Sequence, residues 1–341
     1  MHFDPERSFA LWRLPRERQI FHLAGTPTAF DSVEALLASR ERRFVFAPFA
    51  ITKDCPPIAL VGKIETVEPK IVPADFEIEA LGQNREDYFG QFAKFMQALK
   101  DGKFSKIVLS RRECFFATDS VDPLQIFQKA LETYENAFVY LFHTPQTGTW
   151  LGCSPEILLS SQGAWRTVAL AGTREQGGAW DLKNRREQAL VADFVRERLC
   201  EAGLQICEEK TETVLAGTLE HLKTEFFLNP PSFEQAARAV KILHPTPAVA
   251  GTPRDEALKF ILEHETFPRK YYAGFVGEWG ADVARLFVNL RCMRLEGKTL
   301  EFYAGGGLLP DSLPEAEWRE TAIKMETLGR LFRCYGPRHN L

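Results

Sequence analysis

Three charged residues near the C-terminus have the types and spacing of a binding site. Glu317, Glu320 and Lys324 follow Pro314 along one border of a predicted helix, at about 100° per residue. Two carboxylates at a helix start often only complement the helix dipole, so the glutamates alone are ambiguous. A predicted glycine turn at 305–307 precedes them, allows close backbone approach to a ligand and could direct N–H groups toward an anion. We therefore predict a site for a cation and a carboxylate-bearing molecule.

A further glutamate lies in the middle of an apolar helix face. The pattern over 181–199 predicts a helix in which Glu187 precedes Leu190, Val191 and Phe194 by three, four and seven residues. A charge in such a position must be paired or must coordinate something. We predict a functional or metal-binding role for Glu187, with a buried ion pair to an arginine as the alternative.

Lys106 and Glu156 each lie within an apolar run. In a cleft, the Lys106 amine would lose its charge readily and could act as a general base, whereas on an edge strand it would only discourage aggregation. Glu156 follows Pro155, which interrupts a predicted strand. Apolar neighbours would keep the Glu156 carboxyl protonated, as a general acid requires. An exposed edge position is the alternative for Glu156.

Arg291 is predicted on the middle strand of a three-stranded meander within 271–305. Side-chain alternation places it on the same face as Phe287 and Asn289. Its guanidinium has the geometry to bind a substrate carboxylate through two hydrogen bonds. A surface ion pair is the alternative.

The spacing of apolar residues in the rest of the chain predicts the helices and strands that position these residues. Helices are predicted at 85–101, 181–199, 233–242, 255–263 and from Pro314 onward. Strands in hairpin order lie between them, which favours an α+β fold with largely antiparallel sheets over a doubly wound parallel fold. We assign 1–86 to an irregular N-terminal part of the same fold, with short strands, and 87–341 to its catalytic core.

The composition excludes several classes of protein. A chain of 341 residues with 45% hydrophobic residues can bury a large core, and its net charge of −4 with scattered lysines and arginines argues against a nucleic-acid partner. Seven cysteines without a CxxC pair predict reduced thiols. No apolar run reaches the ~18 residues of a membrane span, so we expect a cytoplasmic protein with no membrane partner. Dinucleotide and P-loop motifs are absent.

The order of several short motifs resembles the chorismate-utilising enzymes, and more narrowly the isochorismate synthases. The motifs are Ser105-Lys-Ile-Val-Leu-Ser-Arg, Gly152-Cys-Ser-Pro-Glu, Leu170-Ala-Gly-Thr-Arg, Lys183-Asn-Arg-Arg-Glu, His221-Leu-Lys-Thr, Leu243-His-Pro-Thr-Pro-Ala-Val-Ala-Gly-Thr-Pro-Arg, Tyr272-Ala-Gly, and Tyr303-Ala-Gly-Gly-Gly followed by Glu317-Trp-Arg-Glu. They cover about 104–328. The resemblance implies a fold like that of anthranilate synthase component I, with two antiparallel sheets packed face to face, helices outside and one magnesium-dependent site.

The resemblance also implies roles for the residues above. Glu187 and the pair Glu317 and Glu320 would hold Mg²⁺, one of the pair through water. Lys106 would activate the water that adds at C2 of chorismate, and Glu156 would protonate the departing C4 hydroxyl, each contributing about 10²–10⁴-fold. The implied substrate-binding residues are Gly172, Thr173, His221, Tyr272, Arg291, Gly307 and Lys324.

Lys106 also separates the activities within this family. Enzymes that use ammonia, the anthranilate and aminodeoxychorismate synthases, usually lack a lysine there, so we expect an isomerase that forms isochorismate for menaquinone or a siderophore. Salicylate synthases share the lysine and then eliminate pyruvate, which makes them the nearest alternative. Less favoured are an ammonia-using component and a non-catalytic chorismate-binding protein. Gly306 and Lys223 depart from the family pattern. We expect a monomer with no glutaminase subunit.

Overall fold

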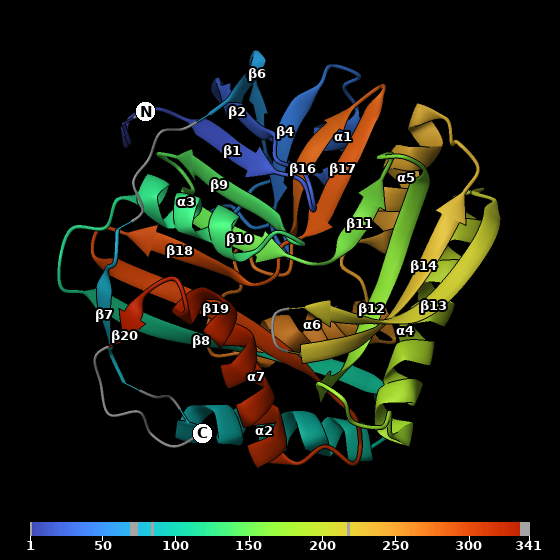
Figure 1. The fold of residues 1–341 in the computed structure, drawn as a ribbon. Coiled ribbons are helices and arrows are strands. Elements are labelled where there is room, and N and C mark those ends of the chain that lie inside the picture. Colours follow the sequence, from blue (N-terminus) through green and yellow to red (C-terminus); the bar gives the residue numbers. More distant parts are fainter. Residues whose placement is uncertain (1, 69–73, 83–84, 217–218, 335–341) are drawn as a thin grey trace.

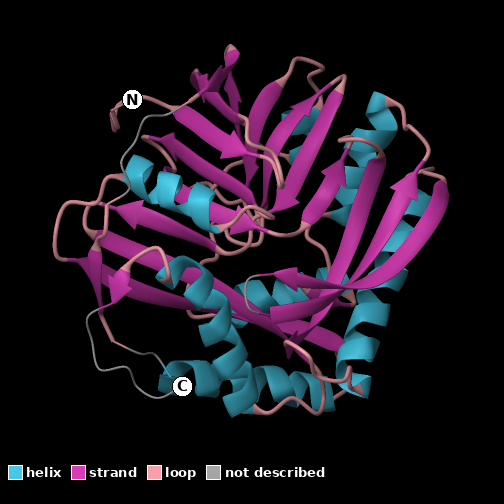
Figure 2. Ribbon diagram, viewed as in Figure 1, coloured by secondary structure: helices cyan, strands magenta, loops and turns pink. Residues whose placement is uncertain are grey.

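Two β-sheets packed face to face, with helices around them, form the molecule (Figures 1 and 2). The computed structural model describes residues 2–68, 74–82, 85–216 and 219–334, without the side chains at 173, 175, 216, 219 and 334. Every strand pair in this part of the chain is antiparallel except β20 with β7. The predicted α+β fold with largely antiparallel sheets is confirmed.

The first sheet has the strand order β20-β7-β8-β19-β18-β10-β9-β1-β2-β6, with β15 paired to β8. Its strands are β1 (Phe9–Arg13), β2 (Ile20–Ala24), β6 (Ile64–Val67), β7 (Glu77–Ala80), β8 (Lys106–Ala117), β9 (Phe138–Thr144), β10 (Gly148–Ser154), β15 (Gly251–Thr252), β18 (Cys292–Glu296), β19 (Thr299–Leu308) and β20 (Arg333–Cys334). The long strands β8 and β19 pair along most of their length, from Ile107 opposite Leu308 to Phe116 opposite Thr299.

The second sheet has the order β13-β14-β12-β11-β17-β16-β4-β5-β3. Its strands are β3 (Thr26–Ala29), β4 (Arg43–Ala47), β5 (Ile58–Val61), β11 (Ile157–Ser160), β12 (Trp165–Glu175), β13 (Ile206–Ala216), β14 (Leu219–Leu228), β16 (Phe275–Gly280) and β17 (Val283–Val288). The chain before residue 87 thus supplies strands to both sheets, and it is more regular than its proline-rich sequence indicates.

Helices cover the outer faces of the sheets (Figure 1). They are α1 (Val33–Leu37), α2 (Arg85–Lys100), α3 (Pro123–Thr133), α4 (Leu182–Glu201), α5 (Phe233–Leu243), α6 (Arg254–His264) and α7 (Pro314–Gly329). The five predicted helices are confirmed as α2 and α4 to α7. Across the described residues, none of these helices has the length and apolar character needed to cross a membrane.

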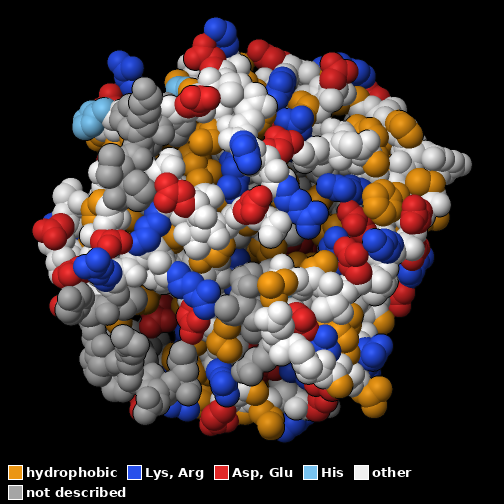
Figure 3. Space-filling model, viewed as in Figure 1, with side chains coloured by type: hydrophobic (Ala, Val, Ile, Leu, Met, Phe, Trp, Pro, Cys, Tyr) orange, Lys and Arg blue, Asp and Glu red, His pale blue; other side chains and the backbone are white. Residues whose placement is uncertain are grey.

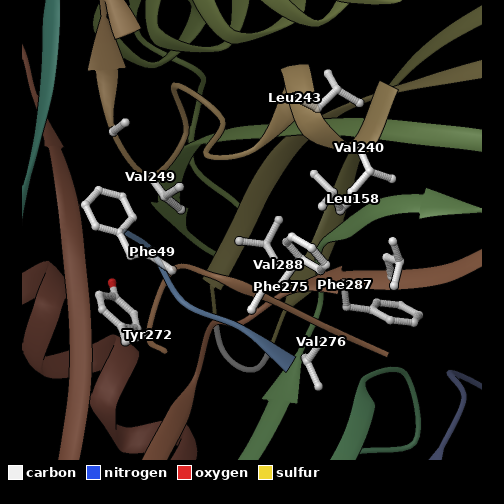
Figure 4. Close-up of a cluster of buried hydrophobic side chains, with 14 of the residues drawn as sticks. Phe49, Leu158, Val240, Leu243, Val249, Tyr272, Phe275, Val276, Phe287 and Val288 are labelled. Carbon is white, nitrogen blue, oxygen red and sulfur yellow. The ribbon is translucent and has the colours of Figure 1, made fainter. Parts of the chain in front are cut away.

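The main core lies between the sheets because alternate side chains of each strand point inward. On β9, Phe138, Tyr140 and Phe142 face the second sheet, whereas Val139 and Leu141 face the opposite way, into a smaller core. Figure 4 shows the main core where it reaches Tyr272, whose ring lies beside Phe49 and Val249. The core therefore extends to the residues predicted to bind substrate.

On the surface, Lys and Arg side chains are interspersed with Asp and Glu (Figure 3).

Two of the places where the chain passes between the sheets lie next to each other. One, from 154 to 157, joins β10 to β11, and the other, from 288 to 292, joins β17 to β18. Hydrogen bonds tie them together: the Val288 amide donates to Glu156 O (2.9 Å), and the Cys153 amide donates to Arg291 O (3.0 Å). The predicted continuous strand through Arg291 is therefore wrong, because the apolar run over 285–294 is shared between the sheets and Arg291 has a left-handed φ of 48°.

The predicted glycine turn at 305–307 is also wrong. These glycines lie inside β19, and Gly305, Gly306 and Gly307 pair with Ser110, Leu109 and Val108 of β8. Three consecutive glycines are typical of a turn, but here the close approach comes from side chains on neighbouring elements. The glycines leave room for those side chains beside the strand.

Candidate active site

A cavity of about 70 Å³ lies where β8, β19, α4, α7 and the two crossovers meet. Eight predicted site residues line it: Glu156, Gly172, Glu187, His221, Tyr272, Arg291, Gly307 and Lys324. Lys106, Glu317 and Glu320 lie directly beside them, as their contacts show below. The predicted Thr173 side chain lies outside the described residues. Tyr303 and Val249 also line the cavity, although their sequence signals are those of ordinary core residues.

Lys106 and Glu187 form an ion pair next to the cavity. Lys106 is fully buried at the start of β8, and its Nζ lies 2.9 Å from Glu187 Oε1, at an angle outside hydrogen-bond geometry. The burial excludes the alternative of an edge-strand lysine with its amine in water. Glu187 is thus paired with a lysine and not with the arginine that was its predicted alternative.

Glu156 is a buried carboxyl on the crossover between β10 and β11. It is 2% exposed, and its Oε1 has no hydrogen-bond partner among the described residues. Burial raises the pKa of Glu156 to about 8, although the positive charges of Lys106 and Lys324 oppose the rise. The buried position excludes the exposed-edge alternative and leaves a carboxyl that is protonated at neutral pH.

Glu317 and Glu320, one helical turn apart on α7, have different environments. Glu317 is 1% exposed, and its Oε1 accepts hydrogen bonds from Lys183 Nζ (2.6 Å) and Ser312 Oγ (2.7 Å). Glu320 Oε1 accepts one from Lys324 Nζ at 2.6 Å. Burial and the charge of Glu320 raise the pKa of Glu317. At Glu320 burial also acts to raise the pKa, but the charge and hydrogen bond of Lys324, together with the charge of Lys183, lower it by more, so the pKa falls. Glu317 therefore takes up a proton more readily than Glu320.

The three glycines of β19 fit against these charged side chains. A Cβ atom on Gly307 would lie 2.3 Å from Glu187 Oε1 and 2.7 Å from Lys106 Cε, and one on Gly306 would lie 3.0 Å from Glu317 Oε2. The contacts at Gly307 are closer than real Cβ atoms come to other atoms, and the contact at Gly306 is tighter than nine in ten real Cβ contacts. The absence of side chains on this strand is what lets α4 and α7 bring their carboxylates to the same place.

Arg291, Tyr272 and His221 form another part of the cavity wall. Arg291 Nη1 donates to Thr327 Oγ1 (2.8 Å) and to Lys324 O (3.2 Å), which fixes the guanidinium, and burial lowers its pKa to about 10. Burial also lowers the pKa of His221 to about 3, so its ring is neutral. A fixed guanidinium beside a neutral imidazole suits the recognition of an anionic ligand.

The carboxylates of Glu187, Glu317 and Glu320 are of the ligand type that hard divalent cations bind. Within the parts of the chain that the structure describes, no group of three acidic, histidine or cysteine side chains converges closely enough to hold a metal ion. Each of the three glutamates is instead bonded to a lysine. Glu317 Oε2, however, is buried without a partner beside Gly306. Magnesium binds through one or two carboxylate oxygens and keeps several waters, so this unpartnered oxygen has the chemistry to act as a ligand of the ion or of one of its waters.

Comparisons with known proteins agree with this geometry. A family model described as "Chorismate binding enzyme" matches residues 65–333. The isochorismate synthase EntC of Escherichia coli K12 is 32% identical over 244 residues, which cover 67% of this chain and 62% of EntC. The isochorismate synthase DhbC of Bacillus subtilis is 33% identical over 272 residues, covering 72% of this chain and 67% of DhbC. The chain thus spans less than two thirds of the length of EntC.

Solved structures extend the likeness to the whole fold. MenF, the menaquinone-specific isochorismate synthase of Escherichia coli, has a TM-score of 0.82 at 22% identity, over 97% of this chain and 90% of MenF. Anthranilate synthase component I of Streptococcus pneumoniae has a TM-score of 0.69 at 17% identity, over 96% and 93%. Identities this low establish the fold alone, and the predicted resemblance to the component I fold is confirmed.

Proposed function

Since this chain belongs to the chorismate-binding enzyme family, we propose that it is an isochorismate synthase that converts chorismate to isochorismate with Mg²⁺. One observation carries the proposal. Glu156, a buried carboxyl that is protonated at neutral pH, lines the cavity, and the buried amine of Lys106 lies directly beside it, 2.9 Å from the cavity residue Glu187. This combination supplies both proton transfers that the isomerisation needs.

In the proposed reaction, Lys106 is the general base and Glu156 is the general acid. Lys106 takes a proton from a water molecule, whose oxygen forms a bond to ring C2. Glu156 gives its proton to the C4 hydroxyl, which leaves as water while the ring double bonds shift. One water enters and one leaves, so the reaction is a net isomerisation. Both side chains are buried away from bulk water, and burial raises the pKa of Glu156 to about 8.

A base must be neutral before it accepts a proton, and this places a condition on Lys106. In the present structure its amine forms an ion pair with Glu187, at 2.9 Å. Turnover therefore requires Glu187 to leave Lys106. The adjacent Gly307 leaves the room that Glu187 occupies beside Lys106, because a Cβ atom there would lie 2.3 Å from Glu187 Oε1.

Substrate orientation is assigned to the positive side chains of the wall. We expect Arg291 and Tyr272 to bind the enolpyruvyl carboxylate, and Lys324 with the backbone of Gly307 to lie beside the ring carboxylate. Gly172, whose φ is +67°, brings the backbone of β12 close to His221, with the Gly172 carbonyl 3.2 Å from Nδ1. These contacts would hold the ring in register with the base and the acid.

Magnesium would supply positive charge to the ring carboxylate and to the charge that develops during the reaction. The residues available to hold it are Glu187, Glu317 and Glu320. Because magnesium keeps several of its waters, one or two direct carboxylate contacts are sufficient. Glu317 Oε2 has no partner among the described residues, so it could accept a hydrogen bond from one of these waters.

A product assay tests the proposal. Purified protein is incubated with chorismate and Mg²⁺, and the products are separated by chromatography; we expect isochorismate, and none when a chelator removes the metal. Unchanged chorismate, or anthranilate formed only with added ammonia, would contradict the proposal. Growth of salicylate fluorescence from chorismate alone would instead support the salicylate synthase alternative, and binding without conversion would support a non-catalytic role.

A further inference from the structure

Each of the three carboxylates is held by a different lysine. The pairs are Glu187 with Lys106 at 2.9 Å, Glu320 with Lys324 at 2.6 Å, and Glu317 with Lys183 at 2.6 Å. The proposed reaction uses Lys106 and Lys324. It gives no role to Lys183, whose contact nevertheless has the same length and the same kind of partner.

Lys183 links the two helices that carry the carboxylates. It lies in the first turn of α4, four residues before Glu187 and therefore on the same helix face. Its side chain is 26% exposed and reaches to Glu317 on α7. Ser312 Oγ donates to the same oxygen, Glu317 Oε1, so Glu317 has one satisfied oxygen and one that is buried without a partner. Lys183 thus fixes which oxygen of Glu317 remains open.

The charges of these three pairs sum to zero. The glutamates contribute three negative charges and the lysines three positive ones. A divalent cation alone would leave two uncompensated positive charges in a largely buried place, which is unfavourable. A substrate that carries two carboxylates restores neutrality. Without the charge of Lys183 the cluster would be negative by one, and a cation would bind more readily before any substrate arrives.

We propose that Lys183 is a positioning residue that acts as the counter-ion of Glu317 and keeps Mg²⁺ binding weak until the dicarboxylate substrate is present. The inference rests on the proposed function for the identity of the cation and the substrate. By linkage, the substrate strengthens Mg²⁺ binding and Mg²⁺ strengthens substrate binding by the same factor. Lys183 therefore sets the coupling between the two ligands.

A purely structural role for Lys183 makes a different prediction. If the lysine only ties α4 to α7, its removal lowers the melting temperature and leaves Mg²⁺ binding unchanged or weaker, because Glu317 loses its support. If it is the counter-ion, removing the charge strengthens Mg²⁺ binding in the absence of substrate. The direction of the change in affinity separates these two roles.

The experiment is calorimetric titration of MgCl₂ into the full-length protein without chorismate. We expect Lys183→Met to lower the Kd for Mg²⁺ by about tenfold, since a unit charge within several ångströms contributes at least 1.4 kcal/mol at an effective dielectric of about 20. Lys183→Gln should behave in the same way, and Lys183→Arg, which keeps the charge, should stay close to the wild type. Lys129→Met removes a lysine that pairs with Asp75 elsewhere and should change nothing.

An unchanged or higher Kd in both neutral variants would overturn the inference, as would undetectable Mg²⁺ binding in the wild type and in both variants. Binding that appears only in the neutral variants would support it. Circular dichroism melts confirm that each variant is folded. Chorismate turnover by the wild type is assayed separately, so that a protein which binds Mg²⁺ as expected but forms no isochorismate refutes the proposed function and not the role of Lys183.

Discussion

Two buried glutamates in this molecule, Glu278 and Glu317, differ in how completely their oxygens are hydrogen-bonded. Glu278 on β16 is fully buried, and both of its oxygens are satisfied by Trp12 Nε1 (2.9 Å), Arg285 Nη1 (3.1 Å) and Arg42 Nε (2.8 Å). Glu317 is also buried, but its Oε2 has no partner among the described residues. Both carboxyl groups lie in the protein interior, and only Glu278 has hydrogen-bond partners for both of its oxygens.

The difference separates groups that hold the fold from groups that await a ligand. Leaving a buried polar atom without a hydrogen bond costs about 1–3 kcal/mol, so a folded protein keeps one only where something else is gained. The Glu278 network joins three strands and needs no other molecule. Glu156 and Glu317, which both have an unpartnered oxygen, lie at the cavity or directly beside it. The comparison predicts that changes at the two places affect different measurements.

The largest effect is expected from Lys106→Met, which removes the proposed base and preserves most of the side-chain volume. We expect kcat to fall by about 10⁴-fold, the upper end for a general base, while chorismate still binds. Steady-state kinetics and a separate binding measurement check this. Lys129→Met is the matched control. Turnover within tenfold of the wild type would refute the assignment of Lys106 as the base.

Glu278→Gln should affect stability and leave the chemistry unchanged. It leaves two arginines without their shared carboxylate, so the free energy of unfolding should fall by about 3 kcal/mol. Urea denaturation measures the loss, and kcat should be retained where the variant is folded. In the control, Glu65→Gln breaks an exposed pair with Lys63 and should leave the free energy of unfolding nearly unchanged. A selective loss of kcat in folded Glu278→Gln would remove the distinction between the two regions.

Gly307→Ala tests the packing of β19 against the carboxylates. The added methyl group would displace Glu187 and Lys106, and a shift of this size can lower kcat/KM by about 10²-fold. Gly90→Ala on α2 is the control, because its new methyl group would have no neighbour within 4 Å. Equal activity of the two alanine variants would show that the close approach at Gly307 has no catalytic role.

The pH dependence should report Glu156. A general acid must be protonated, and the pKa of Glu156 is raised to about 8. Activity should therefore be kept up to about pH 8 and then fall by about tenfold per pH unit as the carboxyl loses its proton. The pH profile of kcat/KM measures this limb, and in Glu156→Gln it should be absent from the residual activity. A profile that falls already near pH 5 would argue against a protonated acid.

Much of the fold, and most of the residues that form the site, could be predicted from the sequence. Helices such as α4 and α7 were identified because their apolar periodicity is long and regular. The two crossovers at Glu156 and Arg291 were not, because an apolar run reads the same whether it stays in one sheet or passes to another. Lys183 was missed as well. Its signal was its position four residues before Glu187, but its partner, Glu317, is distant in sequence.

The paired crossovers have a mechanical consequence. Glu156 and Arg291 lie on two of the segments that connect one sheet to the other, and backbone hydrogen bonds link these two segments directly. If one sheet slides over the other, both side chains move with their segments. The distance between Glu156 and Arg291 therefore depends on how the two sheets are aligned. The core that holds the two sheets in alignment therefore also sets the positions of the active-site side chains. A substitution deep in that core can alter catalysis although it contacts no catalytic residue.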